Sequence, residues 1–337
     1  MKDINKILEL SQKVIQDKDI NKGDADYLSR LKKENINILL IMAGIICEKF
    51  KGRQVDLCSI VNARSSRCSE DCSFCAQSIY HQTDINTHQL LSKKEILKAA
   101  YQAEAAGADR FSLVTTGRGI DGDFENIISI IKEVKKKTNL KLCVSLGLLN
   151  KEAALKLKES GVERYHHNLE TAPSYFEKTC TTHSYQERIE TIHIAQEAGL
   201  EVCSGGILGL GESREQRLEM AFLLKELRVD SVPLNSLNPI PGTPLADKES
   251  LPPLDILQTI AVYRFILPKT DIRYAGGREA NLRDLQALGL IGGINGMLTG
   301  DYLTTSGRKT AEDIVMINDL GLKWSNGYPK LIKNKSS

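Results

Sequence analysis

The chain has 337 residues, of which 41% are hydrophobic and 26% are charged. This composition is ordinary for a globular protein with a sizeable core and excludes the disordered and fibrous classes. The formal net charge of +2 gives no basic excess to neutralise phosphates, so nucleic acid is not an expected partner.

The amino-terminal segment, residues 1–26, is polar and charged, and nowhere do eighteen apolar residues run together. We therefore expect a soluble, cytoplasmic protein with no membrane contact. Eight cysteines in such a chain are not expected to form a disulfide framework, because cytosolic reductants keep thiols free. At least some of them are predicted to serve metal or redox chemistry.

Residues 1–50 are predicted to be helical, because apolar residues recur there at helical spacing: Ile7, Leu8, Leu10, Val14 and Ile15. From residue 55 onward, short β-branched runs alternate with longer amphipathic stretches, which is typical of repeated βα units around a parallel sheet. The predicted strands are 55–63, 110–116, 140–146, 162–169, 200–207, 229–235, 270–275 and, more weakly, 290–294. The predicted helices between them are 93–106, 123–136, 151–160, 184–198, 213–227, 254–266 and 281–289.

About eight such units predict an α/β fold of the TIM type, a (β/α)8 barrel with an N-terminal helical extension. The expected organisation is a helical extension over residues 1–50, the barrel over 51–325 and a polar C-terminal tail over 326–337.

The strongest signal in the sequence is a group of three cysteines after the first predicted strand. Cys68, Cys72 and Cys75 lie together in the segment CSEDCSFC. Thiolates so closely spaced suit a soft metal centre, and three ligands to a four-iron cluster leave one iron free to bind a substrate or cofactor. The alternative is a zinc site or ordinary packing thiols, but a closed zinc site wants four ligands.

The spacing CxxxCxxC, with the aromatic Phe74 before the last cysteine, resembles the hallmark of the radical S-adenosyl-L-methionine (SAM) superfamily. The resemblance implies that Cys68, Cys72 and Cys75 hold a 4Fe-4S cluster whose open iron chelates the amino and carboxylate groups of SAM. It also implies that an electron from the reduced cluster cleaves SAM to a 5'-deoxyadenosyl radical.

Within that superfamily, roughly residues 55–322 resemble the biotin synthase family. The resemblance is carried by the segments 165–171 (YHHNLET), 181–188 (TTHSYQER), 203–212 (CSGGILGLGE), 230–235 (DSVPLN), 242–245 (GTPL), 273–279 (RYAGGRE) and 300–305 (GDYLTT). It implies that Asn168 and Glu170 bond the ribose hydroxyls of SAM and that Arg188 approaches its carboxylate. It also implies that the backbone beside Ile207 approaches adenine, with Phe74 a further cofactor contact.

The same resemblance points to substrate-binding residues. Asn235 matches a family position that holds the ureido ring of dethiobiotin, and a neutral urea requires amide donors and acceptors. Asn168 and His166 are the other substrate-binding candidates. The family often has asparagine where this chain has His166, and a packed histidine is the alternative there.

Strand periodicity gives an independent argument about the barrel interior. Alternation in the third, fifth and seventh predicted strands turns apolar residues outward and Cys143, Cys203 and Arg273 inward. In ordinary barrels branched aliphatic side chains fill that space. By resemblance, these three residues match the ligands of an auxiliary iron-sulfur cluster, 2Fe-2S or a variant type, that gives up sulfide to the product.

One match to the family fails, because its common strand-two cysteine is Ser112 here. Cys58 is the best substitute ligand, since it is predicted to face inward on the first strand, beside the second strand. Cys180, in the loop after the fourth strand, is the reserve candidate, and Cys47 is expected to pack in the N-terminal helical region.

The resemblance implies a radical SAM sulfurtransferase that inserts sulfur into dethiobiotin to form biotin, consuming one SAM in each of two rounds. It further implies a low-potential electron donor, flavodoxin or ferredoxin, and a homodimer. Two alternatives stay open at this point: a related radical SAM maturase or mutase and, in a different class, a zinc-stabilised binding protein, which would be colourless.

Overall fold

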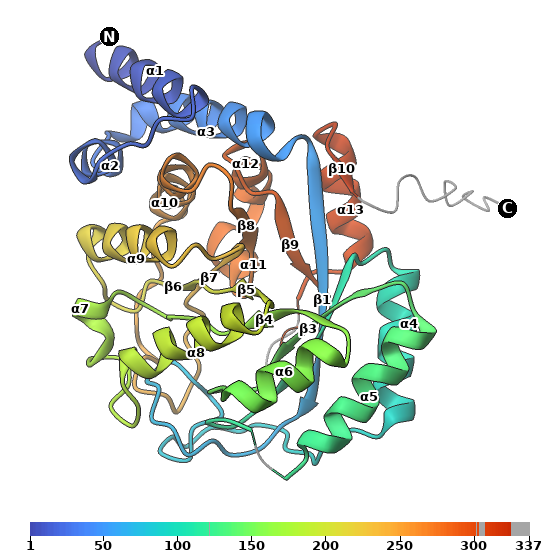
Figure 1. The fold of residues 1–337 in the computed structure, drawn as a ribbon. Coiled ribbons are helices and arrows are strands. Elements are labelled where there is room, and N and C mark those ends of the chain that lie inside the picture. The colour runs from blue at the N-terminus through green and yellow to red at the C-terminus, as the bar shows by residue number, and fades with distance from the viewer. Residues whose placement is uncertain (121, 301, 303–306, 325–337) are drawn as a thin grey trace, which may run out of the picture.

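In the computed structural model, which describes residues 1–120, 122–300, 302 and 307–324, a parallel β-barrel closes because β1 pairs with both β2 and β9 (Figure 1). The barrel strands are β1 (Gln54–Arg64), β2 (Arg110–Thr115), β3 (Lys141–Ser145), β4 (Val162–His166), β5 (Glu201–Cys203), β6 (Gly206–Leu208), β7 (Ser231–Ser236), β8 (Asp271–Tyr274) and β9 (Gly296–Thr299). β5 and β6 both pair with β7 and share one position in the barrel. The predicted TIM-type (β/α)8 barrel is confirmed.

Helices cover the outside of the barrel (Figure 1). They are α4 (Lys93–Ala105), α5 (Phe124–Lys137), α6 (Lys151–Glu159), α7 (Pro173–Phe176), α8 (Tyr185–Glu197), α9 (Arg214–Glu226), α10 (Pro253–Ile266), α11 (Arg278–Leu282), α12 (Gln286–Ile291) and α13 (Thr310–Asp319). Capping boxes fix where α4, α8 and α9 begin, because a serine accepts from the backbone of the third helical residue and that residue's side chain bonds back. These starts lie within one residue of the predicted ones.

The alternation expected for the strands is present. Leu142 and Val144 of β3 are fully buried in the apolar layer between sheet and helices, whereas Cys143 lines the barrel interior. Cys203 and Arg273 also line the interior. Their predicted inward orientation is confirmed.

The weak strand prediction at 290–294 is wrong. Residues 286–291 form α12, and the strand that closes the barrel is β9, which starts at Gly296. A Cβ atom added at Gly296 would lie only 3.1 Å from the Cβ atom of Arg273. This strand therefore begins with a residue of low strand propensity, which hid it in the sequence.

Three helices precede the barrel: α1 (Lys2–Ile15), α2 (Lys22–Ser29) and α3 (Ile36–Lys51). They lie at the end of the barrel where the strands begin, and α3 leads directly into β1 (Figure 1). α3 packs against α10 and α12 and contributes its buried apolar face to the main core. β10 (Lys323–Trp324) extends the sheet beside the first residues of β1.

The predicted polar tail, 326–337, lies outside the described residues, as do positions 301 and 303–305 of the segment GDYLTT. Among the helices that the structure does describe, none has the length and apolar character needed to cross a membrane.

Candidate active site

One cavity of about 460 Å³ occupies the barrel interior and reaches the loops that follow the strands. Apart from the reserve ligand Cys180, every site residue inferred from the sequence lines it: Cys58, Cys68, Cys72, Phe74, Cys75, Cys143, His166, Asn168, Glu170, Arg188, Cys203, Ile207, Asn235 and Arg273. Active sites of such barrels lie at this end, where the strands finish.

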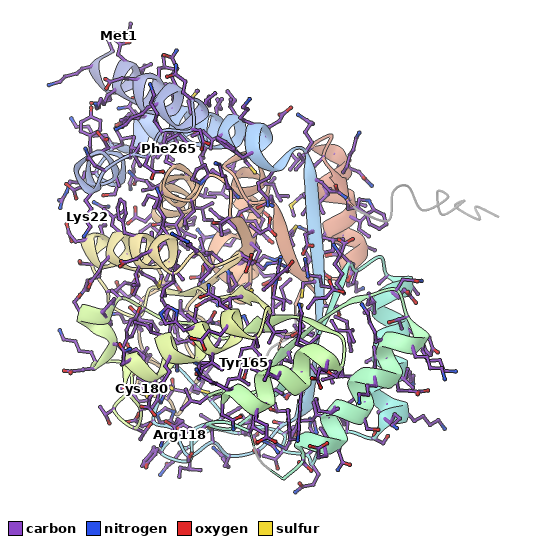
Figure 2. All side chains as sticks on the ribbon, viewed as in Figure 1. Met1, Lys22, Arg118, Tyr165, Cys180 and Phe265 are labelled. Atoms are coloured by element: carbon purple, nitrogen blue, oxygen red, sulfur yellow. The ribbon has the colours of Figure 1, made fainter. Side chains whose placement is uncertain are left out.

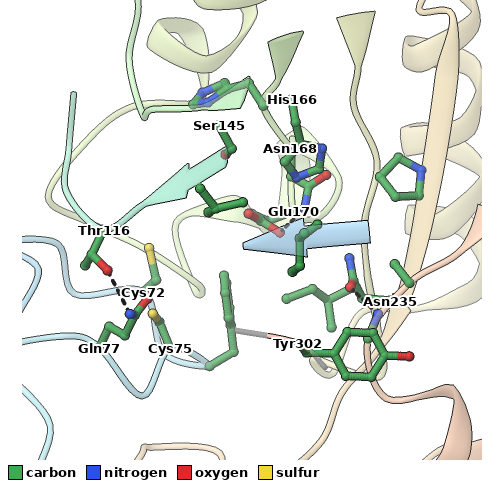
Figure 3. Close-up of a pocket in the computed structure, with 18 of the residues that line it drawn as sticks. Cys72, Cys75, Gln77, Thr116, Ser145, His166, Asn168, Glu170, Asn235 and Tyr302 are labelled. Atoms are coloured by element: carbon green, nitrogen blue, oxygen red, sulfur yellow. Dashed lines mark hydrogen bonds between the residues drawn. The ribbon is translucent and has the colours of Figure 1, made fainter. Parts of the chain in front are cut away.

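The three-cysteine loop lies between β1 and α4. The backbone N–H of Cys68 donates to the carbonyl of Gln77 at 2.6 Å, which closes the loop. The Gln77 side chain in turn donates to Thr116 Oγ1 at 2.7 Å and so ties the loop to the end of β2 (Figure 3). Figure 3 shows Cys72 and Cys75 on this loop at the border of the cavity.

The loop fits an iron-sulfur cluster. Its three thiols are free of disulfides. Burial raises the pKa of Cys75 to about 11, so a thiolate at this position requires the positive charge of a metal, which deprotonates a coordinating thiol. Three soft ligands on one loop are the donor set that leaves one iron of a four-iron cluster open.

Asn168 and Glu170 follow β4 directly. The backbone N–H of Gly205 donates to Asn168 Oδ1 at 3.1 Å, and Asn168 Nδ2 donates to Glu170 Oε2 at 3.3 Å. Glu170 has a φ of 69°, a left-handed conformation that is uncommon for a residue with a side chain. Its carbonyl accepts from the N–H of Ile207 at 2.8 Å, so pairing with the neighbouring strand imposes this conformation.

Arg188 of α8 connects the end of β4 with the cysteine loop. Its Nη1 donates to the carbonyl of Asn168 at 2.7 Å and lies 3.7 Å from Glu170 Oε1. Its Nε donates to His183 Nε2 at 3.0 Å, which leaves His183 Nδ1 to donate to Glu70 at 2.5 Å. Sequence reasoning missed Glu70 and His183, although both lie inside quoted segments, CSEDCSFC and TTHSYQER.

Asn235 ends β7 on another side of the cavity. Its Oδ1 accepts from the backbone N–H of Gly276 at 2.9 Å, and its Nδ2 donates to the carbonyl of Gly206 at 3.3 Å. Tyr302 lies next to Asn235 and was also missed (Figure 3). Its hydroxyl donates to Glu279 at 2.8 Å, which fixes the ring at the border of the cavity.

His166 of β4 is the cross-strand neighbour of Cys203 of β5, and both side chains line the cavity. Burial alone would raise the pKa of Cys203, but a hydrogen bond from His166 and the charges of His166, Arg273 and Arg164 lower it to about 6. The Cys203 thiol is therefore disposed to ionise near neutral pH, as a metal ligand must.

Three thiols lie deeper in the barrel than the cysteine loop: Cys58, Cys143 and Cys203. Ser112 pairs with Ile60 of β1 and with Cys143 of β3, whereas Cys58 pairs with Arg110. Cys58 thus lies one strand away from Ser112 and two residues closer to the start of the barrel. Its predicted inward orientation is confirmed, and its role as a ligand stays a prediction.

Cys180, the reserve ligand, lies close to the cysteine loop rather than to these deeper thiols. Ligand atoms of Cys72, Cys180 and His183 are all within 4.8 Å of one another. A hydrogen bond from Cys72 is the largest influence that lowers the pKa of Cys180 below its ordinary value. Figure 2 places Cys180 toward the edge of the molecule, away from Tyr165 in the barrel wall, and it is not among the residues that line the cavity.

Two family models match the chain. Residues 63–224 match the Radical SAM superfamily, and residues 233–323 match the Biotin and Thiamin Synthesis associated domain. The cysteine loop lies in the first of these regions, and Asn235 and Arg273 lie in the second.

Solved structures of distant proteins share the fold. A methylornithine synthase superposes with a TM-score of 0.82 at 23% identity, covering 94% of this chain and 97% of its own. HydG, a maturase of the [FeFe]-hydrogenase, gives a TM-score of 0.83 at 17% identity, covering 96% of this chain and 76% of its own. At such identities the similarity shows the fold alone.

Curated relatives are much closer in sequence. The biotin synthase of Carboxydothermus hydrogenoformans is 52% identical over 322 residues, which cover 95% of this chain and 99% of that protein. The biotin synthase of Pelotomaculum thermopropionicum is 53% identical over 315 residues, covering 93% and 98%. Because the identity extends over nearly the full length of both proteins and both matched regions, the chain belongs to the biotin synthase family of the radical SAM superfamily.

Proposed function

We propose that the chain is a radical SAM sulfurtransferase that converts dethiobiotin to biotin. The observation that carries the proposal is that one cavity holds two separate groups of thiols, one on the loop and one in the barrel, with polar side chains between them. This arrangement suits a reaction in which one metal centre generates a radical and a second supplies sulfur to the same substrate.

The cofactors are a 4Fe-4S cluster, SAM and an auxiliary iron-sulfur cluster. When bound, the first cluster and SAM supply a 5'-deoxyadenosyl radical, and the auxiliary cluster supplies sulfur. Cys68, Cys72 and Cys75 hold the 4Fe-4S cluster. The cofactor-binding residues for SAM are Phe74, Asn168, Glu170, Arg188 and Ile207.

The chain's own residues orient SAM through the end of β4. The carboxylate of Glu170 accepts hydrogen bonds from ribose hydroxyls, and its position is fixed by Asn168 and by the strand pairing of its own backbone. Arg188, held by the carbonyl of Asn168 and by His183, presents a cation to the carboxylate of SAM.

Asn235 and His166 contact dethiobiotin, with Asn168 the third substrate-binding residue. The Asn235 amide uses one acceptor site for Gly276 and one N–H for Gly206, so it keeps a further acceptor site and a further N–H. A ureido ring, which both donates and accepts, requires this pair.

Cys58, Cys143, Cys203 and Arg273 hold the auxiliary cluster in this proposal. Arg273 is fixed from two sides, because its Nε donates to Ser231 Oγ at 2.8 Å and its Nη2 donates to Asp56 Oδ1 at 2.9 Å. Its remaining nitrogen is available to the cluster.

The reaction consumes electrons, and we assign the low-potential donor to flavodoxin or ferredoxin. A cytoplasmic location and a homodimer complete the proposal; the first is expected from the polar amino-terminal segment and the second from the family resemblance.

Anaerobic incubation of the reconstituted protein with SAM, a low-potential reductant and dethiobiotin tests the function. Mass spectrometry should find biotin and 5'-deoxyadenosine in the same reaction. Deoxyadenosine without biotin would favour a maturase or mutase, and a colourless protein that contains zinc would favour the binding protein.

A further inference from the structure

Three arginines line the cavity beside the deeper thiols: Arg110 of β2, Arg164 of β4 and Arg273 of β8. All three are buried, with at most 5% of each residue exposed. They form a network with the carboxylates of Asp56 and Glu201. We call these three residues the arginine floor.

The network does not satisfy all of its donors. Arg110 Nε donates to Asp56 at 3.1 Å, and its Nη2 lies 3.5 Å from Glu201. Arg164 Nε donates to Glu201 at 2.8 Å, and its Nη2 lies 2.8 Å from the same carboxylate. In both residues the buried Nη1 atom has no hydrogen-bond partner within the described part of the chain. A buried guanidinium N–H without a partner is costly, so two such groups in one cavity point to a ligand.

The two free groups stand next to the proposed ligand thiols. Arg110 is the cross-strand neighbour of Cys58, and Arg164 is the cross-strand neighbour of Cys143. The arginines with unpartnered N–H groups and the thiols are therefore neighbours on adjacent strands in one part of the cavity wall.

The charge of the network favours an anion in that region. Arg110, Arg164, Arg273 and, at the outer edge of the floor, Lys51 face three carboxylates, those of Asp56, Glu201 and Asp271. One positive charge is left over. An iron-sulfur cluster with thiolate ligands carries net negative charge, and its potential depends on charge and on hydrogen bonds to its sulfur atoms.

We propose that Arg110 and Arg164 are positioning residues for the auxiliary cluster and donate N–H hydrogen bonds from Nη1 to its sulfur atoms. Their charge stabilises the reduced cluster and their hydrogen bonds retain its sulfide. This inference rests on the proposed function in one respect, that an auxiliary cluster occupies the barrel interior.

The test replaces Arg164 with methionine, which removes the charge and the donors but keeps an unbranched side chain. Arg164→Met should fold, because the Glu201 side chain that loses its partner is 42% exposed and water can solvate it. We expect the reduction potential of the auxiliary cluster to fall by about 59 mV or more. For a one-electron couple this is at least a tenfold change in the equilibrium constant for reduction. We also expect the variant to lose sulfide faster than the wild type on anaerobic gel filtration.

Arg110→Met should give the same two changes, and Arg164→Lys, which restores the charge, should recover most of the potential. Arg217→Met is the matched control, because Arg217 is an equally buried arginine that pairs with Glu212 at 2.6 Å outside the cavity. The potential of the auxiliary cluster should not change in that control. The spectrum of the 4Fe-4S cluster with SAM should be normal in all four proteins.

Unchanged potential and sulfide retention in both Arg110→Met and Arg164→Met would overturn the inference. If Arg164→Met lost both clusters, the proposal would be tested with Arg164→Lys and Arg110→Met instead. A wild-type potential in Arg110→Met would then count against the proposal. Iron and sulfide counts on the wild-type protein distinguish failure of this inference about the two arginines from failure of the proposed function. A wild-type protein that takes up a single cluster would refute the auxiliary cluster itself.

Discussion

At the scale of single residues, the chemistry depends on thiols whose environments differ. Cys68, Cys72 and Cys75 are on a loop that the side chains of Gln77 and Asp71 hold against neighbouring segments. The deeper thiols are on paired strands. The two groups of thiols are therefore held by different means, the loop by side-chain hydrogen bonds and the barrel thiols by strand pairing.

Replacing Cys68, Cys72 or Cys75 with alanine should abolish SAM cleavage, because a missing thiolate leaves the four-iron cluster under-ligated. The measurement is 5'-deoxyadenosine formed per protein under anaerobic, reducing conditions. Cys47→Ala is the matched control, since Cys47 is buried in α3 among apolar side chains and should leave cleavage unchanged. Wild-type deoxyadenosine formation in all three loop variants would refute the assignment.

Arg273→Met should alter the absorption and EPR spectra of the auxiliary cluster and leave SAM binding at the 4Fe-4S cluster intact. The reason is its place on β8, where its bonds to Ser231 and Asp56 fix the guanidinium in the barrel interior, away from the cysteine loop. Spectra identical to those of the wild type would give this arginine a purely structural role.

At the scale of elements, the thiols of the barrel interior are on β1, β3 and β5. By the family resemblance, a cysteine is common at the position of Ser112 on β2, and Cys58 on β1 faces the same cavity two residues closer to the strand starts. In the proposal, a ligand on β1 in place of one on β2 would hold the cluster at the position whose cross-strand neighbour is Arg110. The geometry and the iron and sulfide content of the cluster can change with it.

Cys58→Ala should therefore lose auxiliary-cluster iron and sulfide and give little biotin, while keeping SAM cleavage. Ser112→Ala should have no such effect, because the hydroxyl is not a ligand in this proposal. Iron and sulfide analysis after anaerobic reconstitution, together with a biotin assay, checks both variants. Normal cluster content in Cys58→Ala, together with losses in Cys180→Ala, would indicate that the ligand is Cys180 in the loop after β4 and not Cys58.

At the scale of the whole molecule, the N-terminal helices cover the end of the barrel opposite the site. α3 crosses α12 so closely that a Cβ at Gly44 would lie 2.1 Å from the carbonyl oxygen of Ile291. A backbone carbonyl cannot move aside as easily as the tip of a flexible side chain. A methyl group at Gly44 must therefore displace α3 or α12.

Gly44→Ala should lower the free energy of unfolding by about 1–3 kcal/mol, the usual cost of overpacking a core. Thermal unfolding of the reconstituted protein measures it, and both cluster spectra should persist because the site is at the far end of the barrel. Ile45→Ala is the control on the same helix, since Ile45 is 46% exposed and its loss should change stability by no more than about 0.5 kcal/mol. Equal stability of the Gly44→Ala and Ile45→Ala proteins would contradict this account of the packing.

The amino-acid sequence by itself determined the features that repeat over short distances. The βα alternation and the inward orientation of Cys58, Cys143 and Cys203 follow from periods of two and 3.6 residues. The starts of three helices follow from local hydrogen bonds of capping serines. The cysteine loop was equally visible, because its ligands lie within one short segment. Such features can be read from the sequence because each depends on residues close together in the chain.

Only the tertiary structure decided which distant residues meet. It placed Cys180 beside Cys72, linked Glu70 to Arg188 through His183, and joined arginines from three strands into a floor with two unpartnered N–H groups. It also moved the last barrel strand to Gly296–Thr299. Each of these depends on strand register and on contacts between segments far apart in the chain, which no local pattern encodes because pairing and packing are settled by the barrel as a whole.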